Sequence, residues 1–443
     1  MKVIIGISLI SLASLVLGDE TCRDVDAGWK VCEESQTINR IAEENALFQS
    51  VLTLDLTKDT TIGENSFSTP KLELLYLQFP YLSKQNISAA RSLSLRPNSF
   101  AGLAKLEHLN IENTYLNFTR GTTFAPLGAL KGLELKRCRL SEVPTKLLES
   151  MPVLEELTLE DNEITALYPN DFAPLKHLKE LDLSSNEIVA IAPGSFDGLS
   201  TLRVLDVSDN ALPASPELFK GLRLLKELRL SKCFDHNGFQ TNVFQEVPYL
   251  EKLQVGFNNI TTLTPGMFDA VLSLRELSLY GNKIREVPKR VFERLRSLKE
   301  ISLADNEIET ITPGAFGFLD LDDLILSLNR RLTTISTETF RGLTVRRLSL
   351  AKCNIATIEP RAFNVTRVTR SLDLTENVLT EVGAEDFAGL WTKDLDLSQN
   401  RIGTIAPNAF KDTVMKRFGF YGNAIKRANR DQWGIKESVE IMM

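Results

Sequence analysis

A short apolar pattern recurs along most of the chain at an almost constant interval. Its form is LxxLxLxxNx(I/L), and clear copies are LEELTLEDNEI (154–164), LKELDLSSNEI (178–188) and LRELSLYGNKI (274–284). The first positions of 14 consecutive copies run from Leu106 to Met415 with spacings of 23 to 25 residues. Repetition at such a period predicts a stack of similar coils, and it constrains the fold more than any other feature of the sequence.

The LxL alternation inside each copy predicts a β-strand with one buried face. Leu157 and Leu159 would face the core, while Glu156 and Glu160 would face solvent. One coil cannot bury its leucines alone, so stacked coils must share a continuous core. The second half of each copy carries Pro or Gly and then Phe, as in IAPGSFDGL (191–199), which favours turns over a long helix.

These units resemble the extracellular leucine-rich-repeat family in its 24-residue class, which includes Toll-type receptor ectodomains, Slit and chaoptin-like repeats. The resemblance implies an α/β fold, a right-handed, horseshoe-shaped solenoid. Its concave side would carry a parallel β-sheet, and its convex side short 3₁₀ or extended segments. About 16 or 17 repeats would fill residues 51–425, regular from residue 106, with two or three irregular copies upstream among 51–56, 72–77 and 90–95.

The first residues are typical of a secretory signal peptide. Lys2 precedes the apolar run 3–17, and Gly18 offers a small-residue cleavage site before Asp19. We therefore expect residues 1–18 to be removed and the mature protein to be secreted and extracellular. No later window contains 18 unbroken apolar residues, so the sequence predicts no membrane insertion.

The overall charge limits the classes of partner. A formal net charge of −7 is a mild acidic excess on a chain of 443 residues. It argues against nucleic acid or an anionic membrane as the main partner. We expect an extracellular protein ligand instead.

Catalytic and metal-binding patterns are not evident. The three histidines, His108, His177 and His236, are roughly three coils apart, which places them about 14 Å or more from one another. No Ser/His/Asp set can assemble from them, and no His/carboxylate spacing indicates a metal site. We expect a protein without enzyme activity and without a cofactor.

Three of the five cysteines occupy the Asn position of their repeats. Cys138, Cys233 and Cys353 are four and five coils apart, on the order of 20 Å. A disulfide needs Cα atoms within about 7 Å. The sequence therefore predicts three buried thiols outside any disulfide.

Cys22 and Cys32 remain, and a disulfide between them would suit an exported protein. It would hold an N-terminal cap, residues 19–50, over the first coil. Related proteins often use four cysteines there, so this cap is a reduced version. The family's cysteine-rich C-terminal cap is absent, and residues 426–443 would form either a cap that packs through Trp433 or a disordered tail.

Four Asn-x-Ser/Thr sequons are acceptors for N-linked glycans in a secreted protein. They begin at Asn86, Asn117, Asn259 and Asn364. The repeat register places Asn259 at the concave rim and Asn364 on the convex side. We expect three or four of them to be used.

Seven carboxylates crowd the solvent-facing positions of three adjacent strands, with no Lys or Arg at these positions. They are Glu156, Glu160, Asp161, Glu180, Asp182, Asp206 and Asp209. Like charges opposite each other on neighbouring strands cost stability. The patch is therefore a candidate site for a basic protein surface or Ca²⁺, with ordinary solubilising charge as the alternative.

An apolar group follows further along the same predicted face. Phe257 and Tyr280 form an aromatic spot, and Ile325 and Leu328 continue an apolar track. Exposed aromatic residues beside charge are typical of the centre of a protein interface. Alternatively, Phe257 packs on its neighbours in the turn. The irregular loop 234–242 precedes this strand and could belong to the same site.

Together these features predict a secreted module that recognises an extracellular protein through its concave face, in innate immunity or in cell-surface adhesion and signalling. Two alternatives remain open. One is a structural matrix protein, which would form homo-oligomers by self-association. The other is a non-catalytic companion subunit of a secreted enzyme.

Overall fold

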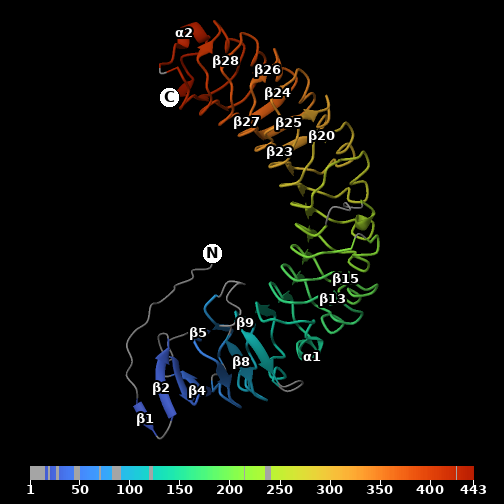
Figure 1. Ribbon diagram of the computed structural model, residues 1–443, viewed down its shortest axis with the longest axis vertical. Helices are drawn as coiled ribbons and strands as arrows, with labels where there is room; N and C mark the ends of the chain where they lie inside the picture. The colour runs from blue at the N-terminus through green and yellow to red at the C-terminus, as the bar shows by residue number, and fades with distance from the viewer. Residues whose placement is uncertain are drawn as a thin grey trace. The chain divides into compact units, whose positions relative to one another are not determined.

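The computed structural model describes most of the chain in two compact units (Figure 1). The described residues are 15–17, 20–25, 29–43, 50–68, 71–81, 91–118, 123–213, 215–234, 241–425 and 427–443. The first unit contains Met1–Pro213 and Lys220–Leu224, and the second contains Ala214–Phe219 and Leu225–Met443. Each unit is a stack of coils, and each coil contributes one strand to a long parallel sheet.

The main sheet of the first unit confirms the predicted strand positions of the regular repeats. Its strands are β5 (Val51–Asp55), β7 (Leu74–Gln78), β9 (His108–Glu112), β11 (Gly132–Lys136), β12 (Glu156–Thr158), β14 (Glu180–Asp182) and β16 (Val204–Asp206). They pair in parallel and in register, so that Leu133, Leu157 and Leu181 lie side by side. These leucines are buried. The residues between them form the outward side, which we call the strand face.

A second sheet in the first unit was not expected. It contains β1 (Leu15–Leu17), β2 (Glu20–Val25), β3 (Trp29–Glu34), β4 (Thr37–Glu43), β6 (Thr60–Ile62), β8 (Ser92–Leu95) and β10 (Tyr115–Phe118). Strands β1 to β4 pair antiparallel, whereas β4, β6, β8 and β10 pair in parallel. Of the two or three irregular copies expected upstream, 51–56 and 72–77 therefore join the main sheet and 90–95 does not. Alternation specifies a half-buried strand but not the sheet that it joins.

The opposite side of the later coils in this unit holds only short elements. They are α1 (Thr145–Leu148), β13 (Ala166–Leu167) and β15 (Ala190–Ile191), and the two strands pair in parallel. The expected signal peptide overlaps β1, whose three residues pair with β2. Cleavage after Gly18, which stays a prediction, would remove β1 and leave β2 as the edge strand.

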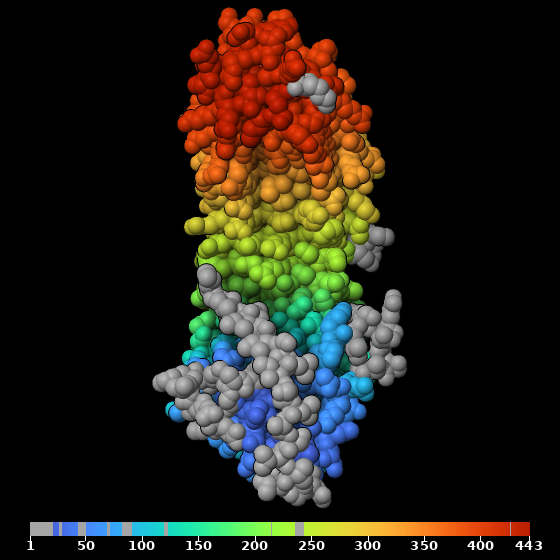
Figure 2. All heavy atoms as spheres, turned by 90° about the vertical axis from the view of Figure 1, so that its left-hand side faces the viewer, coloured from blue at the N-terminus to red at the C-terminus, as the bar shows by residue number. Residues whose placement is uncertain are grey.

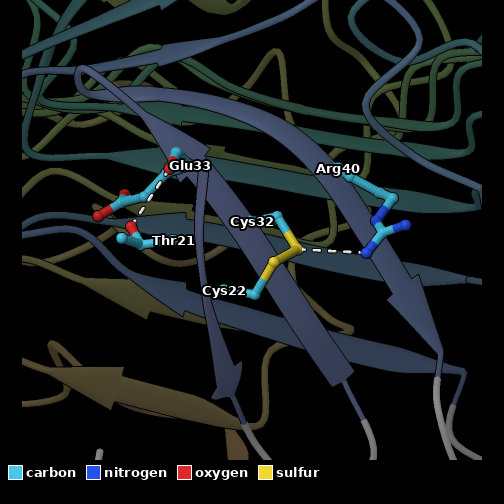
Figure 3. Close-up of a disulfide and its surroundings, with 5 residues drawn as sticks. All are labelled: Thr21, Cys22, Cys32, Glu33 and Arg40. Atoms are coloured by element: carbon cyan, nitrogen blue, oxygen red, sulfur yellow. Dashed lines mark hydrogen bonds between the residues drawn. A yellow bond between two sulfur atoms is a disulfide. The ribbon is translucent and has the colours of Figure 1, made fainter. Parts of the chain in front are cut away.

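A disulfide joins Cys22 and Cys32 across β2 and β3 (Figure 3). The two residues are direct cross-strand partners, and their Cα atoms are 4.0 Å apart. Thr21 Oγ1 donates a hydrogen bond to the backbone oxygen of Glu33, and an Arg40 Nη2 atom lies 3.5 Å from Cys32 Sγ (Figure 3). The disulfide thus reinforces a hairpin that backbone pairing already defines.

The second unit repeats the same coil. Its main parallel sheet contains β17 (Glu227–Arg229), β18 (Lys252–Gln254), β19 (Glu276–Ser278), β21 (Glu300–Ser302), β23 (Asp320–Ile325), β25 (Thr344–Ser349), β27 (Arg367–Asp373), β29 (Asp394–Asp396), β31 (Arg417–Gly419) and β32 (Glu440–Met442). The opposite side carries η2 (Thr241–Phe244), β20 (Glu286–Val287), β22 (Thr310–Ile311), β24 (Thr334–Ile335), β26 (Thr357–Ile358), β28 (Glu381–Val382), β30 (Thr404–Ile405) and α2 (Arg430–Trp433). The predicted short 3₁₀ and extended segments are confirmed.

The recurring phenylalanines form a buried column in this unit. Ring centroids of successive coils are 5.7 to 6.4 Å apart, and the ring planes are within 22° of each other. The members are Phe268, Phe292, Phe316, Phe340, Phe363, Phe387 and Phe410. The column gives the second half of each of these coils a core contact with its neighbours.

A buried Asn in most of the regular coils satisfies the backbone of the turn. Asn282 Nδ2 donates to the carbonyl oxygens of Val255 and Leu279, at 3.0 and 2.8 Å. Its Oδ1 accepts from the backbone N–H groups of Asn258 and Ile260, at 2.9 and 3.1 Å. One amide therefore pairs four buried backbone groups, three of them in the preceding coil.

The C-terminal segment packs against the last coil. Trp433 is 3% exposed, and its ring lies 5.7 Å from that of Phe420. The backbone N–H groups of Asn408 and Phe410 donate to the carbonyl oxygens of Gln432 and Trp433. Strand β32 pairs in parallel with β31 and is the last strand of the main sheet.

Replacing Asn282 by Ala should be strongly destabilising. The change leaves two buried N–H groups and two buried C=O groups without hydrogen-bond partners. We expect this to lower the free energy of unfolding by about 2–4 kcal/mol. Urea unfolding followed by circular dichroism measures this. Lys283→Ala, at the exposed neighbouring residue, is the control. Equal stability of the two variants would refute the proposed role of the amide.

Phe318 is a bulky residue in a conformation that suits glycine. It has φ of 69° and is 84% exposed, whereas Val365 and Asp412, at the same position of later coils, have negative φ. Five other coils have a glycine with positive φ there: Gly102, Gly198, Gly221, Gly342 and Gly389. The left-handed conformation costs an ordinary residue roughly 1–2 kcal/mol.

We therefore expect Phe318→Gly to keep or raise stability, by up to about 1 kcal/mol, because little packing is lost. Phe316→Ala, two residues away in the buried column, should cost about 3–5 kcal/mol. Thermal unfolding of the two variants provides the comparison. A marked drop in melting temperature for Phe318→Gly would show that this side chain stabilises the fold after all.

Candidate binding surfaces

The predicted acidic residues lie on or beside the strand face of the first unit. Glu156 on β12 and Glu180 on β14 are direct cross-strand neighbours, and both are exposed. Asp182 and Asp206 are also direct neighbours, and both are half-buried. The register thus places like charges side by side at two levels, as the sequence predicted.

Two of these carboxylates have a structural role. Asp182 Oδ1 accepts the backbone N–H of Ser184 at 2.8 Å, and Asp206 Oδ1 accepts that of Ser208 at 2.9 Å. The same bond recurs in the second unit, between Asp396 and Ser398. An Asp two residues before Ser or Thr therefore closes the turn after the strand, and these aspartates need no ligand to explain them.

Glu160 is not isolated from positive charge. Lys136 Nζ, at the same position of the preceding coil, lies 3.7 Å from Glu160 and 2.9 Å from Glu134. Burial alone would lower the pKa of Lys136. The hydrogen bond to Glu134 and the charges of Glu134, Glu160 and Glu112 outweigh it and raise that pKa. The acidic patch was expected to have no nearby cation, and this expectation is wrong at Glu160 because Lys136 lies beside it.

Asp161 and Asp209 occupy the left-handed residue of their turns, with φ of 55° and 56°. Among the described residues, no group of three or more His, Cys, Asp or Glu side chains is arranged to hold a metal ion. The Ca²⁺ alternative therefore has no geometric support. Glu156 and Glu180 remain as the two acids that neither a turn nor an ion pair accounts for within the described structure.

The aromatic spot lies in the second unit. The rings of Phe257 and Tyr280 meet edge to face, with centroids 5.0 Å apart. Phe257 has φ of 54°, and a Cβ added at Gly281 would collide with its ring. Phe257 therefore packs over the next coil and is still 43% exposed, and its place in a protein interface stays a prediction.

The apolar track beyond it is interrupted. Ile325 is 38% exposed and Leu328 is half-buried. Ile325 lies directly between Ser302 and Ser349 of the neighbouring strands. The coil of β21 therefore separates Ile325 and Leu328 from the aromatic spot with a polar strand residue.

The three described sequon asparagines differ in exposure. Asn117 on β10 and Asn364 are exposed, and Asn259 is half-buried with φ of 55°. Asn86, His236 and residues 235–240 of the irregular loop lie outside the described residues.

The predicted thiols are confirmed. Cys138, Cys233 and Cys353 are buried and outside any disulfide. Cys138 Sγ donates to the carbonyl oxygen of Ile111 at 3.3 Å, and Cys353 Sγ to that of Leu326 at 3.2 Å. These carbonyls match those that Asn Nδ2 pairs in other coils. Burial raises the pKa of Cys353 from 9.0 to about 12 and raises that of Cys138 as well.

A basic row lies at a lateral position of the repeat, outside the strand-face positions from which the candidate sites were predicted. Arg370, Lys393 and Lys416 are the residues just before the outward strand positions of three successive coils, and all are exposed. Three basic residues at one position of consecutive repeats could have been found in the sequence.

Coils with one strand each, a buried Asn ladder and a Phe column define a solenoid repeat protein. Figure 2 views the second unit, green through yellow to red, from the side on which β23, β25 and β27 lie in Figure 1, and side chains of successive coils form a continuous surface there. No helix among the described residues is long and apolar enough to cross a membrane.

Comparisons with known proteins agree with this class. The family model for the leucine rich repeat matches residues 129–188, 176–233, 248–308, 272–330 and 296–345. The model for the BspA type leucine rich repeat region matches residues 333–427. Together they cover well over half of the chain, which therefore belongs to the leucine-rich-repeat family. Family and fold are those of protein-interaction modules, and neither matching model describes an enzyme family.

Individual relatives share only part of the chain. It is 31% identical over 143 residues to nyctalopin of Mus musculus, and 34% identical over 96 residues to a putative neurotrophin receptor of Lymnaea stagnalis. These matches span 28% and 12% of the relatives' own lengths.

Solved structures share the fold at low identity. A chain of the Drosophila Toll–Spatzle complex matches 94% of this chain with a TM-score of 0.61 and 18% identity, and 66% of that chain is covered. A leucine-rich-repeat protein of Leptospira interrogans matches 82% of this chain with a TM-score of 0.59 and 24% identity, over 95% of its own length.

The thiols should resist alkylation while the chain is folded. At pH 8 we expect iodoacetamide to label none of the three, and all three after guanidinium unfolding, as counted by mass spectrometry. Because burial raises the pKa of the Cys138 and Cys353 thiols above 9.0, their contribution to stability is complete below pH 9 and is lost at higher pH, for Cys353 as pH rises toward about 12. Labelling of Cys353 in the native chain should therefore begin only as the pH approaches about 12. A cysteine labelled in the native chain at pH 8 would contradict the burial.

Proposed function

We propose that the chain is a secreted, non-catalytic recognition module that binds a basic surface of an extracellular protein through Glu156 and Glu180. The single observation that carries the proposal is their geometry. Both side chains are exposed, and they are direct neighbours on adjacent parallel strands. Like charges in this arrangement cost stability, by a few tenths of a kcal/mol up to about 1 kcal/mol.

A bound ligand would offset the repulsion between Glu156 and Glu180. The aspartates beside the pair close turns, and Glu160 is near Lys136, but no ion pair accounts for Glu156 or Glu180 in the described structure. A partner with two or more cations would relieve the repulsion and gain charge-assisted hydrogen bonds. The other acids would raise the local negative potential and speed association.

The similarities support an extracellular role. The Toll–Spatzle complex is a molecular hub in Drosophila development and innate immunity, and one sequence relative is a putative neurotrophin receptor. The apolar N-terminus, the Cys22–Cys32 disulfide and the sequons suit export. We propose that Asn117, Asn259 and Asn364 carry glycans.

A second candidate site is the aromatic spot of the second unit. Phe257 is 43% exposed although it occupies a left-handed residue, a conformation that is unfavourable for a bulky side chain. Exposed aromatic rings often anchor protein interfaces. This site would take an apolar side chain of a partner.

The test is capture of partners from native extracellular fluid by the wild-type chain and by a Glu156→Lys/Glu180→Lys variant. We expect the variant to bind the captured partner about tenfold or more weakly in surface plasmon resonance. Glu163→Lys/Glu187→Lys is the matched control, because both residues are exposed, lie in the same two coils and change the charge equally.

Other outcomes point to other functions. Equal loss in the control would mean that net charge, and not this pair, governs binding. Unchanged binding by both variants would move the site, first to Phe257, where Phe257→Ala tests it. Concentration-dependent oligomers without a partner would favour the matrix role. A stoichiometric secreted enzyme among the captured proteins would favour the companion role.

A further inference from the structure

Nine exposed residues of three successive coils form one lateral surface of the second unit. They lie in three rows: Val365, Gly389 and Asp412; Arg367, Trp391 and Val414; and Arg370, Lys393 and Lys416. We call this set the basic lateral surface. It lies beside the strand face, just before the outward residues of β27, β29 and β31.

Backbone pairing links neighbouring members in each of the three rows. Gly389 N–H donates to the carbonyl oxygen of Asp412 in the first row. In the second row, Trp391 forms parallel bridges with Arg367 and with Val414. In the third row, the backbone N–H of Lys393 donates to the carbonyl oxygen of Arg370, and that of Lys416 donates to the carbonyl oxygen of Lys393. Neighbouring coils are about 4.8 Å apart, so each row spans about 10 Å.

The charge of this surface opposes that of the chain. Four cations and one carboxylate give it a net charge of +3, in a protein whose formal net charge is −7. Earlier in the same lateral row, cations have acidic neighbours: Lys226 pairs with Glu251, and Arg346 with Asp322.

Among the described residues, no acidic side chain forms an ion pair with Arg370, Lys393 or Lys416. All three side chains are exposed. Adjacent like charges are unfavourable, as on the acidic strands of the first unit. An acidic partner would remove this cost.

The surface is also apolar in its centre. Trp391, Val365 and Val414 are 40%, 45% and 46% exposed. The Arg367 guanidinium lies over the Trp391 ring, 5.8 Å from its centroid. Trp and Arg are the residues most enriched at the energetic centre of protein interfaces.

We propose that the basic lateral surface binds an acidic segment of another protein. An apolar side chain of that segment would pack on Trp391, Val365 and Val414, while its carboxylates pair with Arg370, Lys393 and Lys416. A sulfated polysaccharide or a nucleic acid could use the cations, but it would gain little from two exposed valines. The surface is distinct from the acidic pair of the first unit, and its sign of charge is opposite.

Asn364 stands at the border of this surface. Its side chain lies over Gly389, where an added Cβ would collide with Asn364 Oδ1. A glycan on Asn364 would therefore cover part of the first row. The experiment accordingly compares the full-length chain with its Asn364→Gln form, and mass spectrometry reports glycan occupancy.

The probe is a random-peptide library displayed on phage and selected on the Asn364→Gln chain. Enriched peptides should combine Asp or Glu with an aromatic or aliphatic residue. Synthetic copies should bind about tenfold or more weakly to Trp391→Ala and to Lys393→Glu/Lys416→Glu. Affinity should fall as NaCl rises from about 0.05 M to about 0.5 M.

Two controls separate this site from folding and from general charge effects. Lys283→Glu/Lys289→Glu changes the charge equally at two exposed residues outside the surface. Tyr421→Ala removes another exposed ring of the same unit. Neither should change peptide affinity, and thermal unfolding should show all variants folded.

Three results would overturn the proposal. In the first, the selected peptides lack acidic residues, or they bind the lateral variants and the wild type equally. In the second, heparin or a single-stranded oligonucleotide binds more tightly than any peptide, with no effect of Trp391→Ala. In the third, binding requires the glycan on Asn364. Each is independent of the Glu156/Glu180 test, because the variants lie in different units.

Discussion

The buried amide of the repeated Asn holds the other features of this structure in place. Every coil must turn twice, and each turn brings backbone N–H and C=O groups into the interior, where they need partners. Asn282 pairs four such groups and joins consecutive coils. Cys138 and Cys353 replace only the donor half of this amide, through Sγ. Cys therefore takes this position only in single coils. In the coil that follows each, Asn162 or Asn377 accepts a hydrogen bond from the backbone N–H of the cysteine.

The constant register that results turns sequence positions into rows on the surface. Glu156 and Glu180 are neighbours because they share one position of successive repeats, and Lys393 and Lys416 are neighbours for the same reason. Charge can therefore accumulate locally with either sign, whatever the net charge of the chain. The two proposed sites use this property in opposite ways, one acidic and one basic.

Most of the fold could be predicted from the sequence because period and core pattern agree. The strands, the buried thiols and the Cys22–Cys32 disulfide follow from spacing and elimination. The second sheet of the first unit could not be predicted, because the pattern around Ser92–Leu95 is the same for either sheet. The contact of Glu160 with Lys136 could have been found by extending the register one coil upstream. The ring position of Phe257 depends on a left-handed backbone and on Gly281, which no periodicity reveals.

The three buried thiols also bear on how this chain would oxidise correctly in an oxidising compartment. In an oxidising compartment, an unfolded chain with five cysteines can form wrong disulfides. Cys22 and Cys32 are ten residues apart, so their loop closes at a smaller entropic cost than any loop to Cys138 and beyond. Stacking of the coils then removes the other thiols from solvent. In such a compartment, early pairing at the N-terminus and stacking of the coils would together favour the correct disulfide.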